Sequence, residues 1–150
     1  MKKITACLLA GAALTLALPA SAQFAKAEDA IKYRKSAMFV MQENFVRVAR
    51  MAGGKLPFDA KVAAESAAVA DYMAKLPWTG FVTGTDKGDT RAKSEIWTER
   101  AQFDDYARKM QFEMSKLAVA AKSGNLDNIK LAVNATGEHC QSCHDDFRAK

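Results

Sequence analysis

Apolar residues recur at steps of three and four residues in four stretches of the chain, which is the spacing of amphipathic helices. The first helix is expected from about Ala27 to Met51, and the second from about Asp59, as its N-cap, to Lys75. Ser94 can cap a third helix that ends near Lys122, and a fourth starts at Leu126. Along these helices the repeating positions are Ile31, Met38, Met41, Phe45 and Val48; Val62, Ser66, Val69, Met73 and Leu76; Phe103, Tyr106, Met110, Met114 and Leu117; and Leu126, Ile129, Val133, Gly137, Cys140 and His144.

Breaks between these stretches differ in length. Glycines and a proline after the first helix, and Ser123-Gly124-Asn125 before the fourth, make two short turns, whereas residues 77–93 form one long irregular segment. The pattern predicts an all-α fold, an antiparallel four-helix bundle with a long loop between helices two and three. Loops of this length in compact domains usually line or cover a site, so we expect Trp78 and Phe81 to fold back onto a core or a ligand.

The first 22 residues have the features of a secretory signal peptide. Lys2 and Lys3 precede an apolar run from Cys7 to Leu18, and Ala20-Ser21-Ala22 is a cleavage signature. The alternative, an uncleaved membrane anchor, is disfavoured because the run is too short to cross a bilayer. We therefore expect export to the periplasm, residues 1–22 as a cleaved leader, residues 23–150 as a single domain, and no membrane attachment after cleavage.

Removing the leader changes the charge and the cysteine count. The full chain has 22 basic and 17 acidic residues, a net charge of +5; the mature chain would have 20 and 17, hence +3. Such a small excess gives no reason to expect nucleic-acid binding. Only two cysteines remain, too few for a disulfide framework in an exported domain.

Both remaining cysteines lie in Cys140-Gln141-Ser142-Cys143-His144, the C-x-x-C-H pattern of covalent haem c attachment. Each thiol adds to one vinyl group of the porphyrin, and the adjacent imidazole binds the iron. A thioredoxin-like redox pair would follow a strand, and a zinc site would need more ligands. His139 lies about 100° from Cys140 around a helix, so we expect it at the solvated surface.

The antiparallel arrangement also predicts what faces the opposite side of the iron. His144 lies near the end of the fourth helix, so Arg34, Met38 and Met41 of the first helix should lie in the same layer. Met38 could bind the iron as a sixth ligand or line the pocket without a bond, and Arg34 could pair with a propionate. Arg148, four residues after His144, could cover the proximal face or act only as a helix-end cation.

Several motifs together resemble the cytochrome c′ family, the class II c-type cytochromes, over the whole mature chain. They are Gln23-Phe24-Ala25-Lys26, Tyr33-Arg34 with Ser36-Ala37, Leu76-Pro77-Trp78, Gly88-Asp89 leading to Glu95-Ile96-Trp97, and Cys140 to Arg148. The resemblance implies one haem c, a homodimer packed through the first two helices, and five-coordinate high-spin iron that binds nitric oxide and carbon monoxide. It implies roles in nitric-oxide sequestration or electron transfer with a partner protein, and no enzyme activity.

Carried over by position, the resemblance assigns Cys140 and Cys143 to the haem, His144 to the iron and Arg34 to a propionate. It further implies a distal pocket with Met38, pocket surroundings with Trp78, and a proximal pocket with Arg148. Lys35 stands beside the propionate where close relatives tend to have Gln, and Asp89 lies near the haem edge in a slightly longer loop. The alternative within the family is a six-coordinate, low-spin electron carrier with Met38 and His144 as axial ligands.

Overall fold

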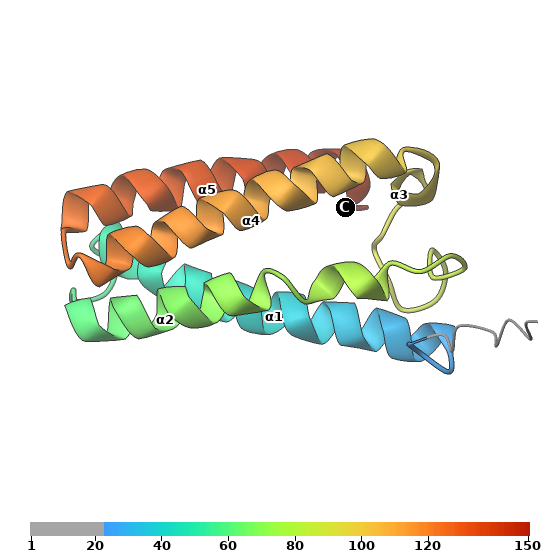
Figure 1. The fold of residues 1–150 in the computed structure, drawn as a ribbon, viewed down its shortest axis with the longest axis horizontal. Helices are drawn as coiled ribbons and strands as arrows, with labels where there is room; N and C mark the ends of the chain where they lie inside the picture. The colour runs from blue at the N-terminus through green and yellow to red at the C-terminus, as the bar shows by residue number, and fades with distance from the viewer. Residues whose placement is uncertain (1–22) are drawn as a thin grey trace, which may run out of the picture.

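The computed structural model describes residues 23–150, and the expected signal peptide over residues 1–22 lies outside the described residues. The chain is helical throughout this part, apart from its connections (Figure 1). The elements in chain order are α1 (Ala27–Ala52), α2 (Ala60–Met73), the 3-10 helix η1 (Pro77–Gly80), α3 (Glu95–Thr98), α4 (Arg100–Lys122) and α5 (Leu126–Phe147).

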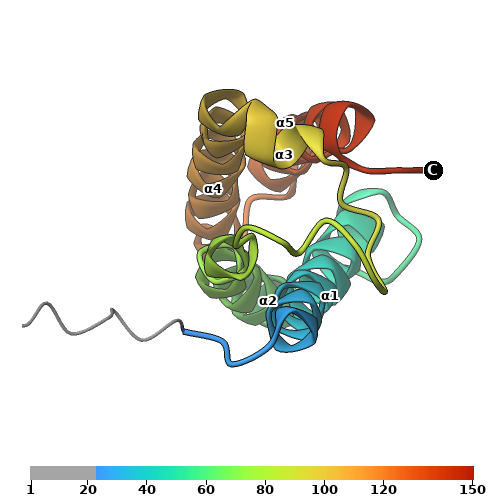
Figure 2. The same ribbon diagram turned by 90° about the vertical axis from the view of Figure 1, so that its right-hand side faces the viewer.

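The four long helices α1, α2, α4 and α5 run alternately in opposite directions and lie side by side along their length (Figure 1). Viewed from the end, they stand at the corners of a square, with α1 beside α2 and α5, and α4 opposite α1 (Figure 2). The predicted antiparallel four-helix bundle with a long connection between its second and third long helices is confirmed. None of the helices within residues 23–150 is long and apolar enough to cross a membrane.

Short side-chain and glycine motifs define several helix ends. Asp59 caps α2 by accepting a hydrogen bond from the backbone N–H of Val62 (3.0 Å), as predicted, and Asn125 caps α5 in the same way through Asn128 (3.0 Å). Gly124 precedes this cap with a φ of 66°, a left-handed conformation that glycine adopts without a steric penalty. These local signals explain why the two short turns lie where the sequence predicted them.

The third helix differs from the prediction, because the expected continuous helix from Ser94 to Lys122 is interrupted at Glu99. Glu99 has non-helical backbone angles, and the Ser94 side chain caps no helix. The preceding loop holds both sides of this break: the Trp97 indole donates to the carbonyl of Val82 (3.0 Å), and Arg100 donates to the carbonyl of Phe81 (3.2 Å). Local periodicity does not encode these long-range contacts, so the sequence pattern did not predict the break.

The buried face of α2 also differs from the predicted stripe. Its core residues are small: Ala63, Ala67 and Ala70 are fully buried, whereas Val69 is 42% exposed. Alanines allow neighbouring helices to approach closely, so burying this face packs α2 tightly against the bundle. Of the predicted stripe, Ser66 is buried as expected, whereas Met73 and Leu76 line a groove beside α1.

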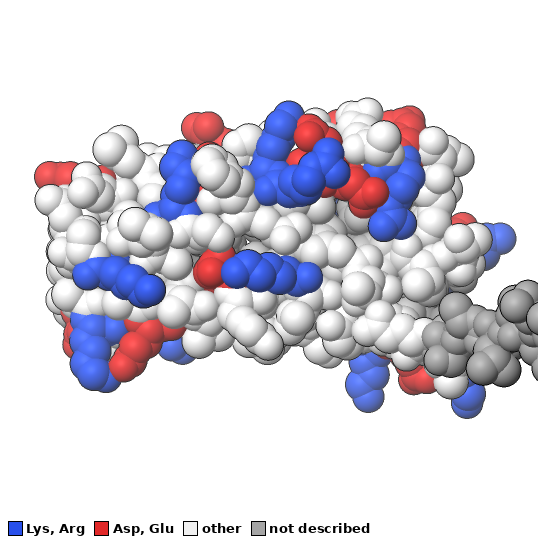
Figure 3. Space-filling model, viewed as in Figure 1, with Lys and Arg blue, Asp and Glu red and all other residues white. Residues whose placement is uncertain are grey.

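Surface charges of both signs lie next to one another on the face that Figure 3 shows. Ion pairs join successive helix turns, for example Lys75 with Asp71 (3.1 Å) and Lys109 with Asp105 (2.7 Å). Exposed pairs of this kind each contribute about 0–1 kcal/mol, so the fold depends on its core.

Candidate haem site

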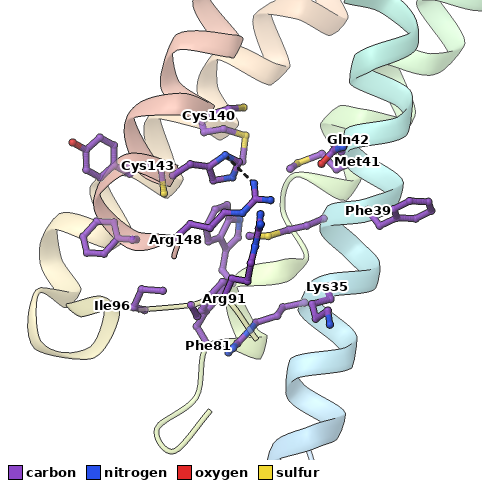
Figure 4. Close-up of a pocket in the computed structure, with 18 of the residues that line it drawn as sticks. Lys35, Phe39, Met41, Gln42, Phe81, Arg91, Ile96, Cys140, Cys143 and Arg148 are labelled. Atoms are coloured by element: carbon purple, nitrogen blue, oxygen red, sulfur yellow. Dashed lines mark hydrogen bonds between the residues drawn. The ribbon is translucent and has the colours of Figure 1, made fainter. Parts of the chain in front are cut away.

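A cavity of about 870 Å³ opens between α1 and α5 (Figure 4). It lies at the end of the bundle that carries the long loop and the C-terminus, which Figure 1 shows. This volume is within the range of about 300–1,000 Å³ that is usual for ligand sites. The cavity separates the halves of α1 and α5 that face each other at this end. The remaining walls come from α4 and from the segment between α2 and α4.

Helix α5 brings Cys140, Cys143 and His144 to one wall of this cavity, and Figure 4 labels the two cysteines there. Both thiols are free and partly buried. Burial raises the pKa of Cys140, and burial together with Cys140 and Asp146 raises the pKa of Cys143 to about 11. Burial lowers the pKa of His144, and the positive charge of Arg91 lowers it further. The site therefore favours neutral thiols and a neutral imidazole, which can coordinate a metal through a ring nitrogen.

Arg148 lies against the imidazole of His144, with its Nη1 3.4 Å from Nδ1 (Figure 4). The arginine follows the last residue of α5 in an extended conformation and pairs with Ala92 in an isolated antiparallel bridge. On either side of this bridge, Lys93 N–H donates to Phe147 (3.0 Å) and Ala149 N–H donates to Arg91 (2.8 Å). The C-terminal residues and the end of the long loop thus hold Arg148 beside His144.

Helix α1 forms the wall opposite α5. Met38, Met41 and Phe45 line the cavity from successive turns of α1. Phe39, Met41 and Gln42 are labelled on this helix in Figure 4. Met38 is partly buried, and it packs against the aromatic cluster that also contacts Cys143. The structure therefore brings the three residues selected on the first helix, Arg34, Met38 and Met41, to the same cavity as His144.

Arg34 is 2% exposed, and its guanidinium is enclosed by the long loop. It donates to the carbonyls of Gly80 (3.0 Å) and Thr85 (2.7 Å) and to the hydroxyls of Thr85 (2.6 Å) and Thr90 (2.8 Å). The ring of Phe81 lies 4.5 Å from its central carbon, a cation–π contact. Burial lowers the pKa of this guanidinium, which nevertheless stays charged at neutral pH because arginine begins from such a high value.

The remaining residues selected from the sequence, on α1 and in the segment after α2, are also at the cavity. Lys35 donates to the carboxylate (2.5 Å) and the carbonyl (3.0 Å) of Asp89, and both residues line the opening. The Trp78 indole donates to the carbonyl of Ala74 (2.6 Å) while its ring packs against both buried clusters of the bundle. With Phe81 only 6% exposed, the expectation that these two aromatic residues fold back onto the core is confirmed.

The position of His139 corrects a further expectation, since this residue is partly buried and lines the cavity rather than lying at the solvated surface. The cavity is wide enough to contact residues on more than one face of α5, so a 100° offset from Cys140 did not exclude His139. Sequence reasoning also missed other lining residues. These are Phe39, Gln42, Thr90 and Ala92, which lie far from the motif along the chain, and Phe147, which follows it closely.

A C-x-x-C-H motif on the wall of a cavity in a four-helix bundle defines a c-type haem protein. The family model of cytochrome c′ matches residues 29–148. The cytochrome c′ of Rubrivivax gelatinosus is 49% identical over 129 residues, covering 85% of this chain and all of the relative, and that of Alcaligenes xylosoxydans xylosoxydans is 39% identical over 128 residues, covering 85% and 99%.

Solved structures of cytochromes c′ also resemble this chain. The crystal structure of the Rubrivivax gelatinosus cytochrome c′ matches with a TM-score of 0.82 and 48% identity, over 85% of this chain and 100% of that one. The cytochrome c′ from Shewanella frigidimarina matches with a TM-score of 0.82 and 41% identity, over 85% and 99%. The chain belongs to the cytochrome c′ family, whose members carry one covalent haem c.

Proposed function

We propose that this protein is an exported cytochrome c′ whose haem is attached through Cys140 and Cys143, with His144 as the axial iron ligand. The observation that carries the proposal is that one wall of the cavity presents both thiols and the imidazole together. When bound, haem c supplies an iron centre that can take up small gases and exchange one electron. The protein would act as a gas-binding or electron-carrying module rather than as an enzyme.

The polar residues of the cavity fit the two negative propionates of a haem. Arg34 is a buried cation whose four bonds go to neutral oxygens, and within residues 23–150 it forms no ion pair. A buried charge without a counter-ion is costly, so an anion next to Arg34 would be stabilised. Lys35 and Asp89 at the cavity opening would lie at the propionate edge of the haem. Lys35 could pair there with the carboxylate of Asp89 or with a propionate.

On the distal side, Met38 would crowd the sixth coordination position. Its neighbours on α1, Met41 and Phe45, also present apolar side chains to the cavity. A distal wall of this kind offers no strong hydrogen bond to a polar ligand such as water or oxygen. The binding of nitric oxide and carbon monoxide depends less on a distal hydrogen bond. A related structure is the nitric oxide complex of a variant of the Alcaligenes xylosoxidans cytochrome c′, 38% identical with a TM-score of 0.79. On the proximal side, Arg148 would flank the His144 ring.

The alternative is a six-coordinate electron carrier with Met38 and His144 both bound to iron. The observation that favours it is the position of the Met38 thioether on the wall opposite His144. A visible absorption spectrum of the oxidised protein separates the two. We expect a high-spin spectrum, and a low-spin spectrum with a methionine-to-iron charge-transfer band would overturn the five-coordinate proposal.

Replacing Met38→Ala tests distal crowding directly. Removing the thioether opens the distal wall, so carbon monoxide should bind the reduced protein faster, by about tenfold for each 1.4 kcal/mol of steric cost relieved. Stopped-flow mixing measures this rate. Phe112→Ala is the control, because Phe112 is 64% exposed on α4 and lies away from the cavity. Equal rates in the wild type and Met38→Ala would contradict the proposal.

We also propose that two copies pair through α1 and α2. A groove of about 520 Å³ runs along the outer edge of these helices, and Val40, Val69 and Tyr72 nearby are 38%, 42% and 66% exposed. Apolar surface of this kind is costly in water and marks an interface. Light scattering should give the mass of a dimer, and Val69→Glu should shift it to that of a monomer. A wild-type monomer at micromolar concentration would contradict this assignment.

Export follows from the leader. We propose that cleavage after Ala22 leaves residues 23–150 as one haem-binding domain in the periplasm. Intact-mass spectrometry of the protein from the periplasmic fraction should give a chain beginning at Gln23 plus one haem. A mass that retains residues 1–22 would contradict the cleavage.

A further inference from the structure

The loop segment from Gly80 to Thr90 accepts hydrogen bonds from both terminal nitrogens of the Arg34 guanidinium. Nη1 donates to Gly80 and to the Thr85 hydroxyl, and Nη2 donates to the Thr85 carbonyl and to the Thr90 hydroxyl. A guanidinium has five N–H groups, of which four are on these two nitrogens. The loop therefore holds the terminal N–H groups of Arg34 in one orientation, and only Nε is left outside this set.

The loop approaches α1 so closely at position 80 that only a glycine fits there without a shift of its neighbours. A Cβ atom at Gly80 would lie 2.8 Å from the carbonyl oxygen of Ala30 and 2.9 Å from Cβ of Arg34. Thr85 is fully buried, and its hydroxyl donates to the carbonyl of Val82 (2.8 Å) while accepting from Arg34. Since the hydroxyl has one hydrogen to donate, this pair of bonds fixes its orientation.

The charge enclosed in this way is not neutralised by the loop. All four acceptors are carbonyl or hydroxyl oxygens, and the nearby carboxylate of Asp89 is paired with Lys35 instead. In a buried site, an electrostatic interaction is stronger than in water because the surroundings screen it less. Arg34 is thus a fixed, weakly screened cation on the wall of the cavity.

We infer that Thr85 and Thr90 are positioning residues that act through Arg34 to hold its positive charge at the cavity wall and so keep the reduction potential of the protein high. The inference rests on the proposed function, because it requires haem c in this cavity. The physical reason is that a nearby cation disfavours the additional positive charge of the oxidised state. If the guanidinium were free to turn toward water, solvent would screen it and the reduced state would lose this advantage.

The test compares hydroxyl-deleting variants of the holoprotein by potentiometric titration. Thr85→Val keeps the shape of the side chain but removes both of its hydrogen bonds, so the potential should shift to a lower value. Thr85→Ser keeps the hydroxyl and should restore most of the wild-type potential. Thr83→Val is the matched control, because Thr83 lies in the same loop but is exposed. The reduction potential of this variant should equal that of the wild type. Thr90→Val provides an independent test if Thr85→Val does not accumulate.

A double-mutant comparison separates positioning from a merely structural role. In an Arg34→Met background there is no charge to position, so Thr85→Val should no longer shift the potential. The same shift in both backgrounds would overturn the inference, as would an unchanged potential in Thr85→Val and Thr90→Val. A second readout is amide hydrogen exchange in residues 80–90, which should be faster in Thr85→Val than in Thr83→Val. Failure of the proposed function would be distinct, since the wild type would then show no haem absorption.

Discussion

The two ends of the bundle are packed with different kinds of side chain. At the closed end, the core contains many alanines, among them Ala67, Ala70 and Ala121, together with a few larger residues such as Leu117. At the open end, the buried cluster consists of Phe81, Ile96, Phe103 and Phe147, with the two tryptophans packed against it. Small residues bring helices together, whereas large flat rings form a wall around a space that the helices leave open.

The aromatic wall is a connected set of rings. Phe103 lies at its centre, with ring centroids 4.8 Å from Phe81, 5.4 Å from Phe147 and 5.7 Å from Trp78, each in an edge-to-face arrangement. Such geometry is favourable beyond the burial of apolar area. The open end thus retains a rigid wall even though the cavity removes part of the helix–helix contact there.

The largest expected effect comes from removing the centre of this wall. Phe103→Ala deletes a ring that is 2% exposed, so it should lower the free energy of unfolding by about 3–5 kcal/mol. Urea denaturation measures the change. Phe112→Ala is the control on the same helix, because Phe112 is 64% exposed and should change stability by less than about 0.5 kcal/mol. Similar losses in the two variants would show that the wall does not contribute as described.

An intermediate effect is expected from overpacking the closed end. Ala70→Leu adds three carbon atoms where the helices approach closely, and should destabilise the protein by about 1–3 kcal/mol. Ala68→Leu places the same side chain on the exposed face of α2 and is the control. If thermal unfolding showed both variants to be equally stable, the closed end would not be as tightly packed as the buried alanines indicate.

The smallest effect should come from the polar edge of the aromatic wall. The Tyr106 hydroxyl donates to Asp146 (2.8 Å), which joins α4 to the last turn of α5. Tyr106→Phe removes only this hydrogen bond, so it should lower the midpoint of urea denaturation slightly, by less than Ala70→Leu does. Thr83→Val is the control, since it removes an exposed hydroxyl from the long loop. A loss as large as that of Ala70→Leu would contradict this ranking.

Much of the fold could be predicted from the sequence because its signals are local. Periodicity gave the four long helices to within about three residues at most ends, and Asp59 was identified as an N-cap from its residue type and position. Glu99 and Val69 show the limit of such signals. The break in the third helix depends on contacts with a loop, and the exposed side of α2 depends on which helices lie beside it.

For the candidate site, the sequence by itself determined the attachment chemistry, since the spacing of Cys140, Cys143 and His144 is a local property of one helix. It also determined that Arg34 and Met38 of the first helix would lie in the same layer as His144, because antiparallel helices match positions by length. Only the tertiary structure decided that His139 lines the cavity and that the loop hydroxyls enclose Arg34. The enclosure of Arg34 joins residues about fifty positions apart, and it depends on how the loop packs against α1 rather than on any repeating pattern along the chain.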